Sequence, residues 1–366
     1  MTPRIVLFGA TGYTGRLVAE RLAAQGERPV LAGRSEARLA PLAERLGLEW
    51  RTADARRPAS LFALVEAGDV LITTVGPFAK WGDAAVRAAV AAPAVYLDST
   101  GEPAFIRRVF EEFGPPAARA GATLMPAMGF DYVPGALAGA LALADGGAGA
   151  ERVDIGYFPL GAGPGMVSRG TVVSLVGAAL EPMFAFRDGA LRTVRAAERT
   201  HSFHVAGRDR TALSIGGAEH FTLPPLDPGL REVNVHAGDF GPAAYAVQAA
   251  SVLTAAVTRV PGVGAALRLA GEQAAGLVPA PAPGSAPAGE SWVAAVARDG
   301  SGRRIAEVRL RGGNPYAFTA GFLAWAARRA AHAGVEPTGA VGPVEAYGLE
   351  AVERGCAEAG LERAPA

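Results

Sequence analysis

The stretch VLFGATGYTGRLVAERL, from Val6 to Leu22, decides the fold. It opens with an apolar run typical of a buried strand and closes with the apolar spacing of a helix. Three glycines stand between them at equal spacing. In this strand–turn–helix context the pattern predicts a turn that holds the pyrophosphate of a dinucleotide at the helix N-terminus. The turn residues expected at the cofactor are Gly9, Ala10, Thr11, Gly12, Tyr13, Thr14 and Gly15.

Strand-like and helix-like segments alternate from this turn through the first third of the chain. Such alternation predicts a parallel sheet with helices on both faces, which is the Rossmann type of α/β fold. The strand candidates cover residues 4–9, 28–34, 48–54, 69–76, 94–98 and 122–128.

After about residue 130 the pattern changes to that of an α+β domain with a mixed sheet. We expect strands at 151–158, 210–217 and 231–238, and a hairpin over 292–312 that turns at Asp299-Gly300. The division predicted is 1–130 for dinucleotide binding, 131–314 for substrate and dimerisation, and 315–366 for C-terminal helices. The expected helices of the later part cover 172–184, 243–257 (a core helix), 317–334 and 344–360.

Composition narrows the classes of partner. The 366 residues include 35 basic and 35 acidic side chains, so no excess charge attracts nucleic acid or anionic lipid. The one cysteine, Cys356, excludes an internal disulfide and a cysteine-rich metal site. His201 and His204 have no further ligand at metal-binding spacing, and we expect no metal. No signal peptide or spanning segment is recognised, so we expect a cytoplasmic protein that does not insert into a membrane. A homodimer is a possible assembly.

The end of the second predicted strand indicates which dinucleotide binds. Proteins that bind NAD usually have an acidic residue there, which accepts hydrogen bonds from the ribose 2′-hydroxyl. This chain instead has Gly33-Arg34-Ser35, with Arg38 one turn later. A guanidinium binds a 2′-phosphate and a carboxylate repels it, so we expect NADP(H) rather than NAD(H). Asp54, at the end of the third strand, is placed to meet the adenine or to serve as a solvated cap.

Candidates for the chemistry follow the later strands. The fourth strand ends in Val75, Gly76, Pro77 and Phe78, which we expect beside the nicotinamide ribose because ligands bind at the carboxyl ends of such strands. Hydride transfer also needs a group that protonates or polarises the acceptor. Our catalytic candidates are Lys80, Glu102, Asp131 and Tyr132, each with an alternative structural or solvated role.

Five segments together resemble the saccharopine dehydrogenase-like oxidoreductases. They are GATGYTG (9–15), AGR (32–34), TVGPF (74–78), VYLDSTGE (95–102) and GFDYVP (129–134). The GTVVS stretch (170–174) and GGNPYAFTAGFLAWAA (312–327) also match segments of that family, so the matches run along nearly the whole chain.

The resemblance implies a Rossmann domain, an inserted mixed-sheet domain, C-terminal helices returning to the first domain, and NAD(P)-linked reduction. The expected function is NADP(H)-dependent reduction of a C=N or C=C bond in a small molecule. One alternative is a trans-acting enoyl reductase of lipid or polyketide synthesis. The other is a non-catalytic sensor or scaffold that binds NADP(H).

Overall fold

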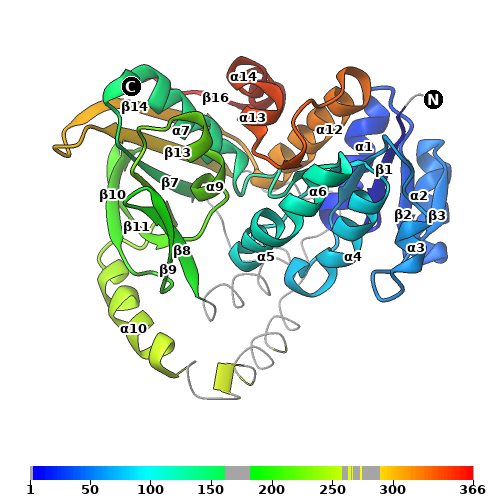
Figure 1. The fold of residues 1–366 in the computed structure, drawn as a ribbon, viewed down its shortest axis with the longest axis horizontal. Helices are drawn as coiled ribbons and strands as arrows, with labels where there is room; N and C mark the ends of the chain where they lie inside the picture. Colours follow the sequence, from blue (N-terminus) through cyan, green and yellow to red (C-terminus); the bar gives the residue numbers. More distant parts are fainter. Residues whose placement is uncertain are drawn as a thin grey trace. The chain divides into compact units, whose positions relative to one another are not determined.

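The computed structural model describes residues 3–160, 182–257, 263–264, 266, 273 and 289–365 (Figure 1). The chain divides into two compact units. The first comprises Met1–Thr100, Phe105–Val133 and Tyr316–Gly360. The second comprises Gly101–Ala104, Pro134–Pro315 and Leu361–Ala366.

A parallel sheet of seven strands forms the first unit, in the order β15-β6-β5-β4-β1-β2-β3. The chain adds β2 and β3 on one side of β1 and then crosses to place β4 on the other side. The crevice at the carboxyl ends of β1 and β4 is therefore the topological switch point, where sheets of this kind bind ligands. The strands are β1 (Ile5–Phe8), β2 (Val30–Gly33), β3 (Trp50–Thr52), β4 (Val70–Thr73), β5 (Val95–Asp98), β6 (Thr123–Met125) and β15 (Gly339–Ala340).

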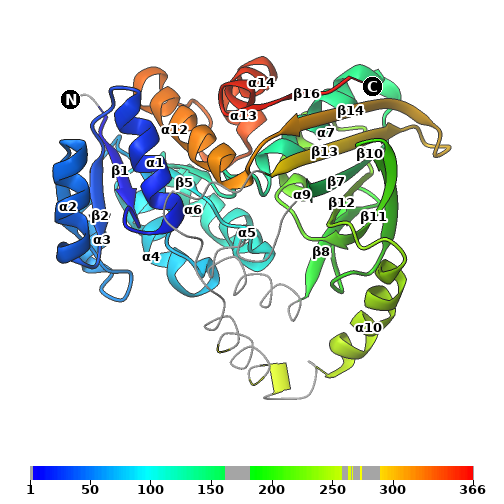
Figure 2. The same ribbon diagram turned by 180° about the vertical axis from the view of Figure 1, so that it is seen from behind.

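Helices follow the strands of this sheet as the alternation predicts. The long helix α12 (Pro315–Ala333) brings the C-terminal part of the chain back to the first unit (Figure 2). A Cβ on its Gly321 would lie 3.1 Å from the Cα of Ala359, so glycine permits this close approach. The other helices here are α1 (Tyr13–Ala24), α2 (Glu36–Leu46), α3 (Ala59–Phe62), α4 (Phe78–Ala91), α5 (Pro103–Arg108), a π-helical turn (Val109–Phe113), α6 (Gly114–Ala120), α13 (Pro343–Tyr347) and α14 (Leu349–Glu358).

The described part of the second unit contains a mixed sheet of nine strands, with the path β10-β11-β12-β7-β13-β14-β16 and β8 and β9 beside β12. β7 and β12 run parallel and the other pairs are antiparallel. The strands are β7 (Arg152–Leu160), β8 (Met183–Arg187), β9 (Ala190–Val194), β10 (Thr200–Val205), β11 (Arg208–Ile215), β12 (Glu232–Ala237), β13 (Glu290–Arg298), β14 (Arg304–Gly312) and β16 (Leu361–Arg363). Its helices are α7 (Val133–Gly146), α9 (Glu219–Thr222) and α10 (Ala243–Val257), with 3₁₀ turns at Gly147–Gly149 and Pro224–Leu226.

A buried polar contact fixes helix α7 on this sheet. The Gly135 N–H donates to the Tyr157 hydroxyl (2.8 Å), which itself donates to Oε1 of the buried Glu219 (2.5 Å). A Cβ at position 135 would lie 2.1 Å from both oxygens. Glycine is therefore required where the helix begins.

The predicted fold class is confirmed, including the parallel sheet, the mixed sheet and the 292–312 hairpin. One predicted helix is wrong at its end, because Met183 and Phe184 belong to β8. The rest of that helix, residues 172–181, and the GTVVS stretch lie outside the described residues. The helix predicted over 344–360 is interrupted at Gly348, whose φ of +81° favours glycine.

Helix α10 is also different from its prediction, because it is not a core helix. Tyr245, Val252 and Leu253 are 61%, 52% and 70% exposed. Two of its polar side chains contact the segment between β9 and β10: Gln248 donates to the Glu198 carbonyl and Ser251 accepts from Arg195. The sequence of α10 contains no charged residue, so it has no polar stripe that would reveal which side is outward. None of the helices described is long and apolar enough to cross a membrane.

Candidate active site

The glycine turn is fixed between the ends of three strands of the first unit. The N–H groups of Gly9 and Ala10 donate to the carbonyl of Ala32 at 2.8 and 3.2 Å. The Thr74 hydroxyl donates to the Gly9 carbonyl (3.2 Å), and Gly9 has a φ of +94°. The turn therefore has one shape, set by β2 on one side and the end of β4 on the other.

The three glycines serve different purposes in this turn. A Cβ on Gly15 would lie 2.2 Å from the Gly9 carbonyl oxygen, and one on Gly9 would lie 2.6 Å from Oγ1 of Thr74. A Cβ on Gly12 would meet only the Gly9 oxygen, at 3.3 Å. Gly9 and Gly15 are thus required by protein packing, whereas the space in front of Gly12 is open for a ligand.

Helix α1 begins directly behind this open space. Gly12 is its N-cap and offers no side-chain acceptor, so the first-turn N–H groups point outward without an intrahelical partner. No acidic side chain occupies that turn. The residues present therefore fit the pyrophosphate of a dinucleotide, held by backbone N–H groups and the positive helix end.

Two arginines lie beside the turn, at the end of β2. Arg34 is exposed, and its side chain has no hydrogen-bond partner among the described residues. Arg38, in the first turn of α2, donates from Nη2 to the Thr11 carbonyl (2.9 Å). Ser35 is the N-cap of the same helix.

Asp54 follows β3 at the same edge of the sheet. Its buried carboxylate accepts two bonds from Nε and one from Nη2 of Arg56, at 2.7–3.1 Å, and one from the Arg56 backbone N–H. These hydrogen bonds lower the pKa of Asp54 to about 2. Contact of Asp54 with adenine stays a prediction, and its carboxylate is bound to Arg56 in this structure.

The segment after β4 lies next along the edge. Val75 and Gly76 lead into a cis Gly76–Pro77 peptide, and α4 begins at the buried Phe78, whose ring packs on Phe105 with centroids 5.6 Å apart. Lys80 is exposed in the first turn of α4, with Nζ 5.0 Å from the centre of the Trp81 ring.

A fully buried carboxylate, Asp98, joins the ends of β5 and β6. It accepts hydrogen bonds from the Tyr96 hydroxyl and from the N–H groups of Thr100 and Ala127, each at 2.8 Å. The Met128 N–H donates to its carbonyl (2.7 Å). Asp98 therefore fixes the turn over residues 126–132, which carries two of the catalytic candidates.

Asp131 and Tyr132 differ in exposure although they are adjacent and joined by a cis peptide. Tyr132 is 5% exposed and its N–H donates to the Ala127 carbonyl. Asp131 is exposed as a residue, and desolvation by the protein around its carboxyl raises its pKa to about 6. A carboxyl with that pKa exchanges a proton near neutrality, as a general acid must.

Sequence reasoning missed the contribution of α12 to this edge. Thr319 accepts a hydrogen bond from the Phe130 N–H (3.0 Å), and the Tyr316 ring meets Tyr13 edge to face, with centroids 5.1 Å apart. The start of α12 thus contacts both the glycine turn and the turn before Asp131. Only the family-like GGNPYAFTA segment indicated it, and its Thr319 is 189 residues from Phe130 in the sequence.

The catalytic candidates are therefore not all brought together. Lys80, Asp131 and Tyr132 belong to the first unit, at the edge where β4 and β6 end. Glu102 is buried and is grouped with the second unit.

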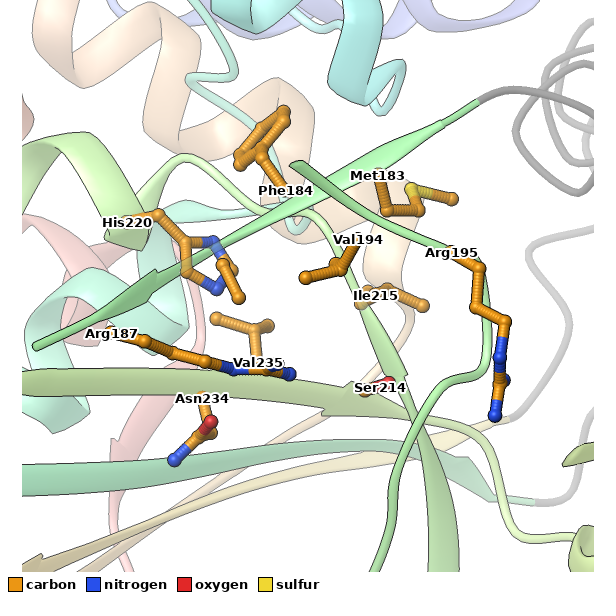
Figure 3. Close-up of a pocket in the computed structure, with 11 residues that line it drawn as sticks. Met183, Phe184, Arg187, Val194, Arg195, Ser214, Ile215, His220, Asn234 and Val235 are labelled. Atoms are coloured by element: carbon orange, nitrogen blue, oxygen red, sulfur yellow. The ribbon is translucent and has the colours of Figure 1, made fainter. Parts of the chain in front are cut away.

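The second unit has a small pocket of its own (Figure 3). Arg187 enters it from β8, with Nη atoms paired to Glu198 and a buried Nε that has no partner among the described residues. Burial lowers the pKa of His220 to about 4, so its ring is neutral at physiological pH. The pocket thus has both apolar and polar side chains in its lining. The other lining residues are Met183, Phe184, Ala185, Val194, Arg195, Ser214, Ile215, Asn234 and Val235.

The chain resembles known proteins in sequence over part of its length. Residues 9–95 match the model of a family described as NAD(P)H-binding. A putative trans-acting enoyl reductase of Mycobacterium tuberculosis is 44% identical over 143 residues, which cover 36% of this chain and 34% of that protein. A trans-acting enoyl reductase of Mycobacterium bovis is 42% identical over 137 residues, 36% of this chain and 33% of that protein. The chain thus spans about a third of the length of the curated relatives it matches.

In structure the likeness extends over the whole chain. Saccharopine dehydrogenase (L-Glu forming) from Saccharomyces cerevisiae superposes with a TM-score of 0.63 and 12% identity, covering 99% of this chain and 100% of that one. The chain therefore has the saccharopine dehydrogenase-like fold with an NAD(P)-binding domain. The matched relatives are named enoyl reductases, and the structural neighbour is named a dehydrogenase.

Proposed function

We propose that this chain is an NADPH-dependent reductase of an activated C=C bond in an acyl substrate. The observation that carries this proposal is the 42–44% identity to enzymes named trans-acting enoyl reductases. The saccharopine dehydrogenase-like fold and the open space at Gly12 support the nicotinamide cofactor. In this proposal residues 131–314 hold the substrate and form the homodimer, residues 315–366 complete the first domain, and the protein is cytoplasmic.

The residues at the sheet edge divide the work. The glycine turn and the first turn of α1 hold the pyrophosphate, and residues 75–78 lie along the nicotinamide ribose. The bound cofactor supplies a hydride to the acceptor carbon. Asp131, as the protonated acid, donates a proton to the neighbouring carbon. Tyr132 and Lys80 orient the acyl carbonyl, and Glu102 is a further catalytic candidate.

A C=N bond is the second candidate acceptor, and the likeness to saccharopine dehydrogenase over 99% of the chain favours it. The two acceptors make different demands on Asp131. An enoyl group receives the proton on carbon, whereas an imine receives it on nitrogen and is already activated when protonated.

Turnover of defined substrates separates these functions. We expect the protein to oxidise NADPH with a 2-enoyl pantetheine thioester and not with mixtures of a 2-oxo acid and an amino acid. Oxidation only with the imine-forming mixtures would assign the C=N reaction. Tight NADPH binding without turnover of either panel would favour a sensor or scaffold.

Arg34 should decide the preference for NADPH. Because Arg34 is exposed and unpaired among the described residues, its guanidinium is available to a 2′-phosphate. We expect Arg34→Gln to weaken NADPH about 10- to 100-fold and to leave NADH within twofold, measured by cofactor fluorescence. Equal losses for both cofactors would contradict this role.

A further inference from the structure

The ends of β2 and β3 place a second pair of charged side chains next to Arg34. Gly33 is in register with Thr52, and the Ala53 N–H donates to the Gly33 carbonyl (2.9 Å). Arg34 and Asp54 directly follow Gly33 and Ala53, the two residues that this hydrogen bond joins. Arg56 is held at the same edge of the sheet by its hydrogen bonds to Asp54.

In the Asp54–Arg56 pair, the aspartate is buried and fully hydrogen-bonded, whereas the arginine is exposed to solvent. Asp54 is 7% exposed, and both of its carboxylate oxygens are used by Arg56. The Arg56 side chain is 60% exposed, and its Nη1 has no partner among the described residues. A guanidinium has five N–H donors in a fixed plane, so Nη1 remains available to an oxyanion.

Stability alone does not account for this geometry. An ion pair with an exposed arginine contributes little to folding. However, a long side chain that is already ordered loses less entropy when it binds a ligand. Because Asp54 already orders the Arg56 side chain, that side chain would lose less entropy when a ligand binds.

Other charges at this edge agree with an anionic ligand. Arg34, Arg38 and Arg57 are exposed here, together with Glu36 at the start of α2. The bound carboxylate of Asp54 offsets the charge of Arg56 only. The remaining excess is positive, as a phosphate requires.

We infer that Asp54 positions Arg56 as a second arginine for the 2′-phosphate of NADPH, opposite Arg34. This inference rests on the proposed preference for NADPH. It assigns Asp54 to positioning rather than to the adenine, and it makes Arg56 a specificity-determining residue.

Binding of NADPH and NADH to variants, measured without substrate, tests the inference. Arg56→Gln and Asp54→Asn are each expected to weaken NADPH about tenfold or more and to leave NADH within twofold. Arg51→Gln is the matched control, because Arg51 is an exposed arginine of β3 that pairs with Glu49. It should change neither affinity.

Two results would overturn the inference. If Asp54→Asn weakens both cofactors equally, Asp54 contacts the adenine or holds the fold. If Arg56→Gln leaves NADPH binding unchanged, Arg56 does not touch the phosphate, and this variant decides the matter even if Asp54→Asn fails to fold. Failure of enoyl reduction with these selective losses intact would instead overturn only the proposed reaction.

Discussion

Replacing Gly15 with alanine is expected to abolish cofactor binding and to lower the free energy of unfolding by about 3 kcal/mol or more. The new Cβ would lie 2.2 Å from the Gly9 carbonyl oxygen and 2.9 Å from Oγ1 of Thr74. Neither neighbour moves freely, because the oxygen is backbone and the hydroxyl donates to it. Urea denaturation measures the loss of stability, and NADPH fluorescence measures binding.

Gly12→Ala is the matched control for this prediction. Its Cβ would meet only the Gly9 oxygen at 3.3 Å, so the fold should be kept with a stability change below about 1 kcal/mol. The same methyl group would occupy the space assigned to the pyrophosphate, so affinity for NADPH and NADH should fall together. A Gly12→Ala protein that binds both cofactors normally would place the pyrophosphate elsewhere.

Replacing Asp131 with asparagine is expected to lower kcat about 100-fold or more and to leave NADPH affinity unchanged. Asparagine keeps the shape of the side chain but has no acidic proton to give. Asp209→Asn is the control, because that aspartate is 80% exposed in the second unit and pairs only with His204 among the described residues. Steady-state turnover of the enoyl thioester measures the effect.

The pH profile gives a second readout of Asp131. Its pKa, raised to about 6 by desolvation, means that the protonated donor predominates below pH 6 and declines tenfold per pH unit well above it. The wild-type kcat/KM should therefore fall as pH rises through about 6, and Asp131→Asn should lose that limb. The same limb in both proteins would assign the proton to another group.

The parallel sheet could be predicted because its strands are buried on both faces. β1 and β4 are continuous apolar runs, and the helices between the strands show their own period. Strands β8, β9 and β10 were missed, since β9 carries exposed polar side chains and its edge position weakens the apolar pattern. The outward face of α10 was also invisible, because all of its residues are uncharged.

The part of the site that could be predicted is the glycine turn, because only glycine fits the backbone geometry at its key positions. Gly9, Gly12 and Gly15 could be assigned from spacing and context, and the structure shows two of them closed by protein and one open. The Asp54–Arg56 pair could not be predicted from the sequence. In an exposed loop, side chains two residues apart can either hydrogen-bond to each other or be solvated, and the sequence does not distinguish the two. The contact of Thr319 with Phe130 depends on a return of the chain that no local pattern encodes.

The hydrogen bonds of Asp98 have a mechanical consequence. Because one buried carboxylate and its own carbonyl hold the N–H groups of Thr100, Ala127 and Met128, the turn before Asp131 is tied to strand β5 and not to a free loop. Such a turn moves as part of the sheet and opens only when the sheet edge itself opens. The proposed proton donor, Asp131, is therefore carried by the sheet itself rather than by a loop that moves independently of it.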